Sequence, residues 1–189
     1  MIGAFGLALL VAFSVWLIAS HGSRRPGVPA GQPLRLFAAP LAASNLNGDA
    51  NLNPPCTAAR HDPRALNVCL LVRRAPLVLA FFVTGSRDCE RQVDTLQALS
   101  PAFPSRAVQF AAVAVDAAHA PTAALVRGHL WTIPVAYDRD GAVGALYDVA
   151  VCPMLELARR GGTVAELLVG NRWLTASALQ ARVRALLAR

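Results

Sequence analysis

An uninterrupted apolar run, PLVLAFFVT at residues 76–84, is the feature that most constrains the fold of this chain. Such a strand is buried on both faces, which is typical of the inner strands of a sheet covered by helices. The run ends before Gly85, and the polar segment that follows is predicted to form a helix over residues 88–99 with Asp88 as N-cap. The sequence therefore predicts a buried strand that turns into a helix, with one cysteine, Cys89, at the junction.

The remainder of the chain continues this alternation of strands and helices. We expect strands over 107–116 and 133–138, helices over 121–130 and 142–149, a hairpin over 154–170 that turns at Gly161–Gly162, and an amphipathic helix over 175–189. Strands joined through helices pair in parallel, whereas a hairpin adds antiparallel strands. The pattern predicts an α/β fold around a mixed sheet.

Residues 1–20 are predicted to be a transmembrane anchor. Residues 2–20 carry no charge, and a helix of that length, at about 1.5 Å per residue, just spans a hydrocarbon core of roughly 30 Å. A cleaved signal peptide is the alternative, but its basic n-region is missing. Residues 21–55 are rich in Gly, Pro, Ala and Asn and are expected to be a tether and loop segment. Residues 56–189 are expected to form the domain.

The composition argues against nucleic acid and metal as partners. The formal net charge is +7 and the pI is about 10.5, but the 18 basic residues, all arginine, form no cluster larger than a pair along the chain. A nucleic-acid surface concentrates its basic residues on one face. No Cys or His spacing fits zinc, and DRDG at 138–141 lacks the other ligands of a calcium loop. We expect no nucleic acid, no metal and no cofactor.

The four cysteines are compatible with two disulfides in an oxidising compartment. Cys56 and Cys69 bracket a short segment before the first core strand, and a bridge between them would contribute about 3 kcal/mol of stability. We favour this structural disulfide, although four cysteines allow three pairings and one of these two could instead resolve a bond at Cys89. A helix N-terminus at Cys89 favours its reactive thiolate form. An inert, buried cysteine is the alternative.

The order of the elements, with a cysteine where the first buried strand meets its helix, resembles the thioredoxin-like superfamily. The match covers residues 76–188: PLVLAFFVTGSRDC leads into the redox motif, VAVD is the next strand, and IPVAYDRDGAVGALYDV precedes the cis-proline. VCPMLELARRGGTVAELLVG then matches the cis-proline, the hairpin and the closing glycine. The chain looks most like membrane-tethered bacterial thiol–disulfide oxidoreductases and AhpC/TSA-like redoxins. The resemblance implies an α/β/α sandwich and makes Pro153 the cis-proline.

Two positions depart from the pattern of that family. Ser86 stands where the oxidoreductases carry their exposed, attacking cysteine, which gives S-x-x-C in place of C-x-x-C, and Cys152 stands directly before Pro153. In the family's fold the residue before the cis-proline lies against the redox motif. The resemblance therefore implies that Cys89 pairs with Cys152 and exchanges thiols and disulfides with protein partners. Cys89 would be the reactive thiol and Cys152 its resolving partner.

Two other functions stay open. A peroxiredoxin-like peroxidase would use Cys89 with the Ser86 hydroxyl to orient the peroxide, although Phe82 stands where that family places a proline. A non-catalytic module would bind partner proteins and hold its cysteines in structural bridges.

The side of the membrane on which the domain lies is a separate question. Arg24 and Arg25 follow the apolar stretch, and the positive-inside rule alone would leave the domain in the cytoplasm. The cysteines and the resemblance point the other way. We expect a single-pass protein of the cell membrane with an extracytoplasmic domain.

Overall fold

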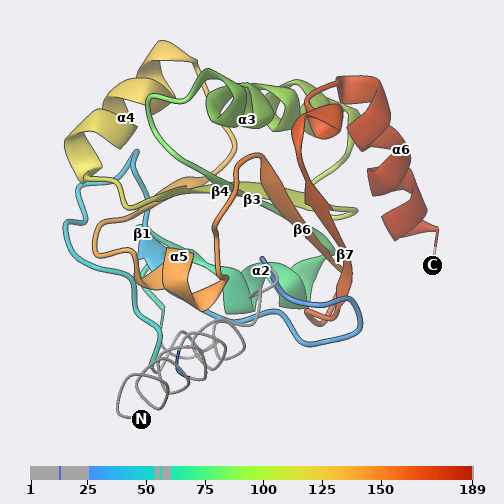
Figure 1. The fold of residues 1–189 in the computed structure, drawn as a ribbon, viewed down its shortest axis with the longest axis horizontal. Coiled ribbons are helices and arrows are strands. Elements are labelled where there is room, and N and C mark those ends of the chain that lie inside the picture. The colour runs from blue at the N-terminus through green and yellow to red at the C-terminus, as the bar shows by residue number, and fades with distance from the viewer. Residues whose placement is uncertain (1–12, 14–25, 54–55, 57–60, 189) are drawn as a thin grey trace, which may run out of the picture.

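The computed structural model describes residues 13, 26–53, 56 and 61–188. Strands and helices alternate through most of this part of the chain (Figure 1). The strands are β1 (Ala38–Pro40), β2 (Ala65–Asn67), β3 (Leu77–Phe82), β4 (Gln109–Val115), β5 (Val135–Asp138), β6 (Met154–Ala158) and β7 (Val164–Val169). The helices are α2 (Val68–Arg74), α3 (Arg87–Leu99), α4 (His119–Gly128), α5 (Ala142–Leu146) and α6 (Ala176–Leu187), with short 3₁₀ turns η1 (Ser100–Ala102) and η2 (Asn171–Trp173).

Five strands form the central sheet in the order β5-β4-β3-β6-β7. β3 pairs in parallel with β4, and β4 with β5, whereas β6 runs antiparallel to both β3 and β7. All six residues of β3 are buried, as expected for the strand at the centre of a covered sheet. The mixed sheet predicted from the sequence is confirmed.

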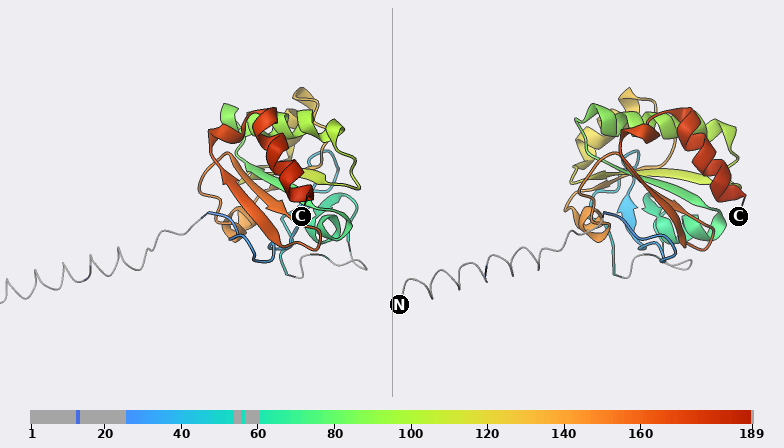
Figure 2. Two further views of the ribbon diagram at one scale, coloured as in Figure 1. Left: turned by 90° about the vertical axis from the view of Figure 1, so that its right-hand side faces the viewer. Right: turned by 45° about the vertical axis from the view of Figure 1, so that its right-hand side comes forward.

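Helices cover both faces of this sheet. Helices α3, α4 and α6 lie on one face, while α2, α5 and the two-stranded sheet of β1 and β2 lie on the other (Figures 1 and 2). Each face has its own apolar cluster. Phe81 and Phe82 belong to different clusters, because successive side chains of a strand point to opposite faces. The result is the three-layered α/β/α arrangement that the resemblance implies.

Residues 26–53, for which the sequence predicts a tether and loop segment, are built into the domain. Val28, Leu34 and Phe37 are 2%, 4% and 0% exposed, and β1 pairs antiparallel with β2. The backbone N–H of Gly31 also donates to the carbonyl of Val164 at 2.8 Å. The spacing of the buried residues matches neither a helix nor a strand, so a search for periodicity misses this packing.

The predicted membrane anchor lies almost entirely outside the described residues, since only Phe13 of residues 2–20 is described. Within the part of the chain that the structure describes, no helix combines the length and apolarity needed to cross a membrane.

Candidate functional site

The turn from β3 into α3 places Cys89 at a helix N-terminus. Gly85 has a φ of +81°, a left-handed conformation that glycine adopts without steric cost. Ser86 is the N-cap, with an extended φ of −106°, so the predicted N-cap at Asp88 is wrong and the helix begins one residue earlier than predicted. Cys89 is the third helical residue, and the backbone N–H groups of this first turn have no acceptor within the helix.

Cys152 reaches the same place from the loop between α5 and β6. The structure joins it to Cys89 in a disulfide with a Cα–Cα distance of 5.6 Å, across 63 positions of sequence. The Cys152–Pro153 peptide bond is cis, as the resemblance implies. Cys89 is only 4% exposed, whereas Cys152 is partly exposed. Solvent and partner molecules therefore have readier access to the Cys152 side of the bond.

Gln92 connects the two segments that carry the disulfide. Its side chain is fully buried, one turn after Cys89, and its Oε1 accepts a hydrogen bond from the backbone N–H of Met154 at 3.3 Å. Its Nε2 has no hydrogen-bond partner among the described residues. No role was predicted for Gln92 from the sequence, although its position three residues after Cys89 on one helical face was a usable signal.

Acidic groups and one histidine surround the start of α3. Glu90 accepts a hydrogen bond from the backbone N–H of Gly85 at 2.7 Å, and its other oxygen lies 3.8 Å from Nε2 of His129. Nδ1 of His129 lies 2.9 Å from the carboxylate of Asp94. The sequence analysis assigned no role to His129 near Cys89. In the structure this ring links two of the three carboxylates of α3, those of Glu90 and Asp94.

Ser86 and Pro153, the other predicted site residues, lie on the two segments that the disulfide joins. The Ser86 hydroxyl makes no capping hydrogen bond to the helix, and the residue is partly exposed. The carbonyl of Pro153 accepts a hydrogen bond from Gly170 at 3.0 Å, which ties the cis-proline loop to the end of β7. Four predicted residues therefore gather at one site: Ser86, Cys89, Cys152 and Pro153.

The second disulfide lies on the other side of the sheet. Cys56 and Cys69 are joined with a Cα–Cα distance of 6.0 Å, and Cys69 belongs to α2, which packs on the face opposite α3 (Figure 1). The sheet thus separates the two pairs of sulfur atoms. In this arrangement neither Cys56 nor Cys69 can act directly on Cys89.

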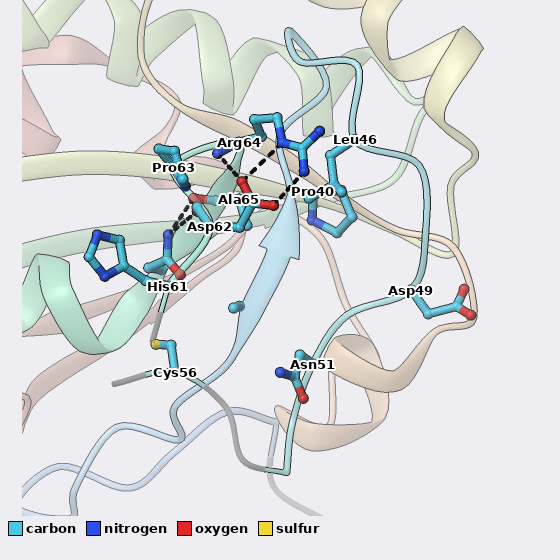
Figure 3. Close-up of a pocket in the computed structure, with 12 residues that line it drawn as sticks. Pro40, Leu46, Asp49, Asn51, Cys56, His61, Asp62, Pro63, Arg64 and Ala65 are labelled. Carbon is cyan, nitrogen blue, oxygen red and sulfur yellow. Dashed lines mark hydrogen bonds and ion pairs between the residues drawn. The ribbon is translucent and has the colours of Figure 1, made fainter. Parts of the chain in front are cut away.

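Cys56 also lies at the edge of a hollow of about 640 Å³ (Figure 3). Asp62 and Arg64 form an ion pair of 2.8 Å in its wall, and hydrogen bonds from Arg64 lower the pKa of Asp62 to about 2. The charges in this wall neutralise each other. Across the described residues, no group of three or more His, Cys, Asp or Glu side chains could hold a metal ion.

Glu156 is a buried carboxylate on the face of the sheet opposite the Cys89–Cys152 pair. It is 0% exposed in β6, on the sheet face that carries α2 and α5, and its Oε1 accepts a hydrogen bond from the backbone N–H of Val28 at 2.5 Å. Burial raises the pKa of Glu156 to about 7, while the Val28 hydrogen bond and the charge of Arg35 act in the opposite direction. The sequence analysis missed this residue, which lies between the buried Leu155 and Leu157.

Comparisons with solved structures agree with this fold. A putative thiol:disulfide interchange protein DsbE from Chlorobium tepidum is 19% identical, with a TM-score of 0.67, over 85% of this chain and 99% of that chain. A secreted disulfide oxidoreductase of Mycobacterium tuberculosis, homologous to E. coli DsbE, is 23% identical, with a TM-score of 0.56, over 64% of this chain and 88% of that chain. The peroxidoxin BcpB of Mycobacterium tuberculosis is 12% identical, with a TM-score of 0.62, over 84% of this chain and 96% of that chain. At these identities the similarity shows the thioredoxin-like fold.

Comparison of the sequence with models of protein families identifies a family. No curated protein matches the chain. The model of the AhpC/TSA family, however, matches residues 55–165, which is more than half of the chain and includes both Cys89 and Cys152. The chain therefore belongs to the AhpC/TSA family.

Proposed function

We propose that this protein exchanges thiols and disulfides with protein substrates through Cys89 and Cys152. The observation that carries the proposal is the bond between these two residues where the β3–α3 turn meets the cis-proline loop. The family match supports a redox function, and two of the similar structures are of an interchange protein and a disulfide oxidoreductase.

The exposure of the two cysteines suggests the order of the steps. A substrate thiolate attacks Sγ of Cys152, the more exposed residue, and forms a mixed disulfide with it. The bond to Cys89 breaks, and Sγ of Cys89 leaves as a thiolate with the electron pair of that bond. A second substrate thiolate then attacks the substrate sulfur of the mixed disulfide and releases the Cys152 thiolate. Two electrons pass from the substrate to the protein, and the reverse sequence reduces a substrate disulfide.

This order exchanges the roles that the sequence suggested for the two cysteines. Cys89 becomes the shielded leaving group, and the start of α3 suits it to that role, because unpaired backbone N–H groups and the positive end of the helix dipole stabilise a thiolate. A stabilised thiolate leaves faster in exchange. The neighbouring carboxylate of Glu90 opposes this effect, but it is engaged by Gly85 and lies beside His129.

A test needs the full chain and three variants. We expect the wild type to reduce insulin disulfides with a dithiol as electron donor, and Cys89→Ser and Cys152→Ser each to abolish that activity. The matched control is the double variant Cys56→Ser/Cys69→Ser, which removes the other bridge and is expected to remain active. Activity that survives the loss of Cys89 or Cys152 would contradict the proposal.

A peroxidase that uses Ser86 and Cys89 is the second candidate, because the similar structures include a peroxidoxin and Ser86 lies at the N-cap of α3. Peroxide consumption that requires Ser86 would favour a peroxidase over thiol–disulfide exchange.

A non-catalytic module is the third candidate. It predicts a reduction potential for the Cys89–Cys152 pair below about −300 mV, in the range of structural disulfides, whereas exchange predicts a higher value.

We further propose that residues 2–20 anchor the protein in the cell membrane and that the domain lies outside the cytoplasm. The uncharged N-terminal stretch supports the anchor, and the two disulfides support an oxidising compartment. After mild reduction, a membrane-impermeant maleimide applied to intact cells should label the protein in the membrane fraction. A mature N-terminus near residue 21 would show a cleaved signal peptide instead.

A further inference from the structure

A hollow lined by arginines lies at the end of the sheet opposite the redox pair. Its volume is about 690 Å³, and its polar lining consists of four arginines, one serine and one glutamine: Arg73, Arg74, Arg106, Arg160, Ser105 and Gln109. These residues come from the end of α2, from the segment that enters β4 and from the turn after β6. Both β3 and β4 begin beside it, since Leu77 is in register with Gln109 and with Ala158.

The positive charge of this hollow is not balanced by carboxylates. Its lining includes no Asp or Glu, and none of its four arginines forms an ion pair within the described residues. Other arginines do have such partners, among them Arg64, Arg139 and Arg182. Like charges gathered in one concavity repel one another and raise the local concentration of anions. An anion bound in the hollow would relieve this repulsion.

The backbone that carries the arginines is firmly connected. The N–H of Gly161 donates to the carbonyl of Val72 at 2.7 Å, and Nε of Arg160 donates to the carbonyl of Arg73 at 3.1 Å. These bonds occupy two carbonyl oxygens at the C-terminal end of α2 that would otherwise repel an anion. A guanidinium has five N–H donors, so Arg160 keeps four for a ligand.

We propose that this hollow, called here the arginine hollow, binds the phosphate groups of a small phosphorylated compound or of a phospholipid headgroup. Planar guanidinium groups match phosphate oxygens with paired hydrogen bonds, and the Ser105 hydroxyl and the Gln109 amide add neutral donors. The volume exceeds that of a single phosphate. The occupant is not the thiol substrate, because β3 separates this end of the sheet from the Cys89 turn by about 20 Å at roughly 3.3 Å per residue.

The sequence alone does not reveal this cluster. Along the chain the arginines form only pairs, such as Arg73–Arg74 and Arg159–Arg160, with Arg106 isolated between them. The fold brings α2, the start of β4 and the β6–β7 turn to one edge, and so turns scattered charges into one site. The proposal stands on this placement and does not depend on the redox function.

The test is calorimetric titration of the full chain in an uncharged detergent. One arm uses pyrophosphate, and the other compares short-chain phosphatidylglycerol with phosphatidylcholine. We expect saturable binding of at least one phosphate probe, with phosphatidylglycerol preferred over phosphatidylcholine if the source is lipid. The variant Arg74→Gln/Arg106→Gln should bind about tenfold more weakly or worse, because it loses charge-assisted hydrogen bonds. Arg160 is left intact because it also holds the end of α2.

The matched control is Arg127→Gln/Arg184→Gln, which removes the same charge from exposed residues of α4 and α6. It should bind within about twofold of the wild type, since distant surface charges are largely screened by salt. Absence of binding to both phosphate probes would overturn the proposal. Equal weakening in the two double variants would also overturn it, because the effect would then be one of net charge.

Discussion

The side-chain oxygen of Gln92 accepts a hydrogen bond from the backbone N–H of Met154. This contact links the helix that carries Cys89 to the strand that begins two residues after Cys152, so the disulfide is not the only connection between them. The two segments should therefore stay together while the sulfur atoms are separate.

Gln92→Leu is expected to lower the free energy of unfolding of the oxidised protein by about 1 kcal/mol. Leucine keeps most of the buried volume but leaves the Met154 N–H without an acceptor. Urea unfolding measures the change. Gln180→Leu, at a partly buried position of α6, serves as the control and should change the free energy of unfolding by no more than about 0.5 kcal/mol. Equal effects of the two substitutions would mean that the Gln92 contact adds nothing to stability.

The reduced Cys89→Ser variant should accumulate mixed disulfides with disulfide-containing substrates through Cys152. The Cys152 thiolate can attack a substrate disulfide and release one substrate thiolate, and the Cys89 sulfur that would resolve the adduct is gone. Cys152→Ser should form far fewer, because Cys89 is 4% exposed. Non-reducing electrophoresis, after each reduced variant is incubated with a small protein that carries one disulfide, measures the amount of adduct. If Cys152→Ser forms more mixed disulfide than Cys89→Ser, Cys89 is the attacking thiol, as predicted from the sequence.

Ser86→Cys is expected to increase insulin reduction. The new sulfur would lie at the N-cap of α3, partly exposed and three residues before Cys89, in the position of the attacking cysteine of C-x-x-C enzymes. Turbidity of the released insulin chains measures the rate. Ser177→Cys, at an exposed position of α6, controls for the presence of one extra thiol, and a similar rate increase in that variant would count against the explanation.

Glu156 should make the folded protein less stable as the pH rises from about 5 to 7. Its pKa is about 7 in the folded state, against an ordinary value of 4.5, so the folded protein holds a proton in this range that the unfolded chain has released. Stability then falls with pH by roughly 3 kcal/mol in total and levels off above about pH 7.

Glu156→Gln keeps the acceptor for the Val28 N–H and removes the titration. It should therefore lose that part of the pH dependence and be more stable than the wild type at pH 8, as measured by urea unfolding at several pH values with the disulfides intact. Glu166→Gln, which removes a carboxylate paired with Arg182, should keep the slope. If the free energy of unfolding of Glu156→Gln still falls with pH as steeply as that of the wild type, another group causes the pH dependence.

The sheet and its helices could be predicted because local patterns specify them. The apolar run that became β3 and the glycine pair that turns the β6–β7 hairpin each carry their own signal. The packing of residues 26–53 could not be predicted, because Val28, Leu34 and Phe37 are spaced without a period and owe their burial to distant partners such as Val164.

The candidate site was predictable only with the help of the resemblance. A helix N-terminus at Cys89 follows from the sequence, but its contact with Cys152 depends on how the chain crosses the sheet. Buried polar residues were the hardest to foresee. Gln92 and Glu156 would both be expected at the surface from their residue types, and only the folded chain places them inside.

The bond between Cys89 and Cys152 also closes the chain into a ring that contains β4, α4, β5 and α5. A protease that cuts the backbone once between residues 90 and 151, for instance after the exposed Arg106 or Arg127, would produce two pieces that remain one covalent molecule. They would separate in denaturant only after reduction. An oxidised molecule that has been cut once therefore keeps both pieces. Release of a fragment in denaturant would show that the Cys89–Cys152 disulfide has been reduced.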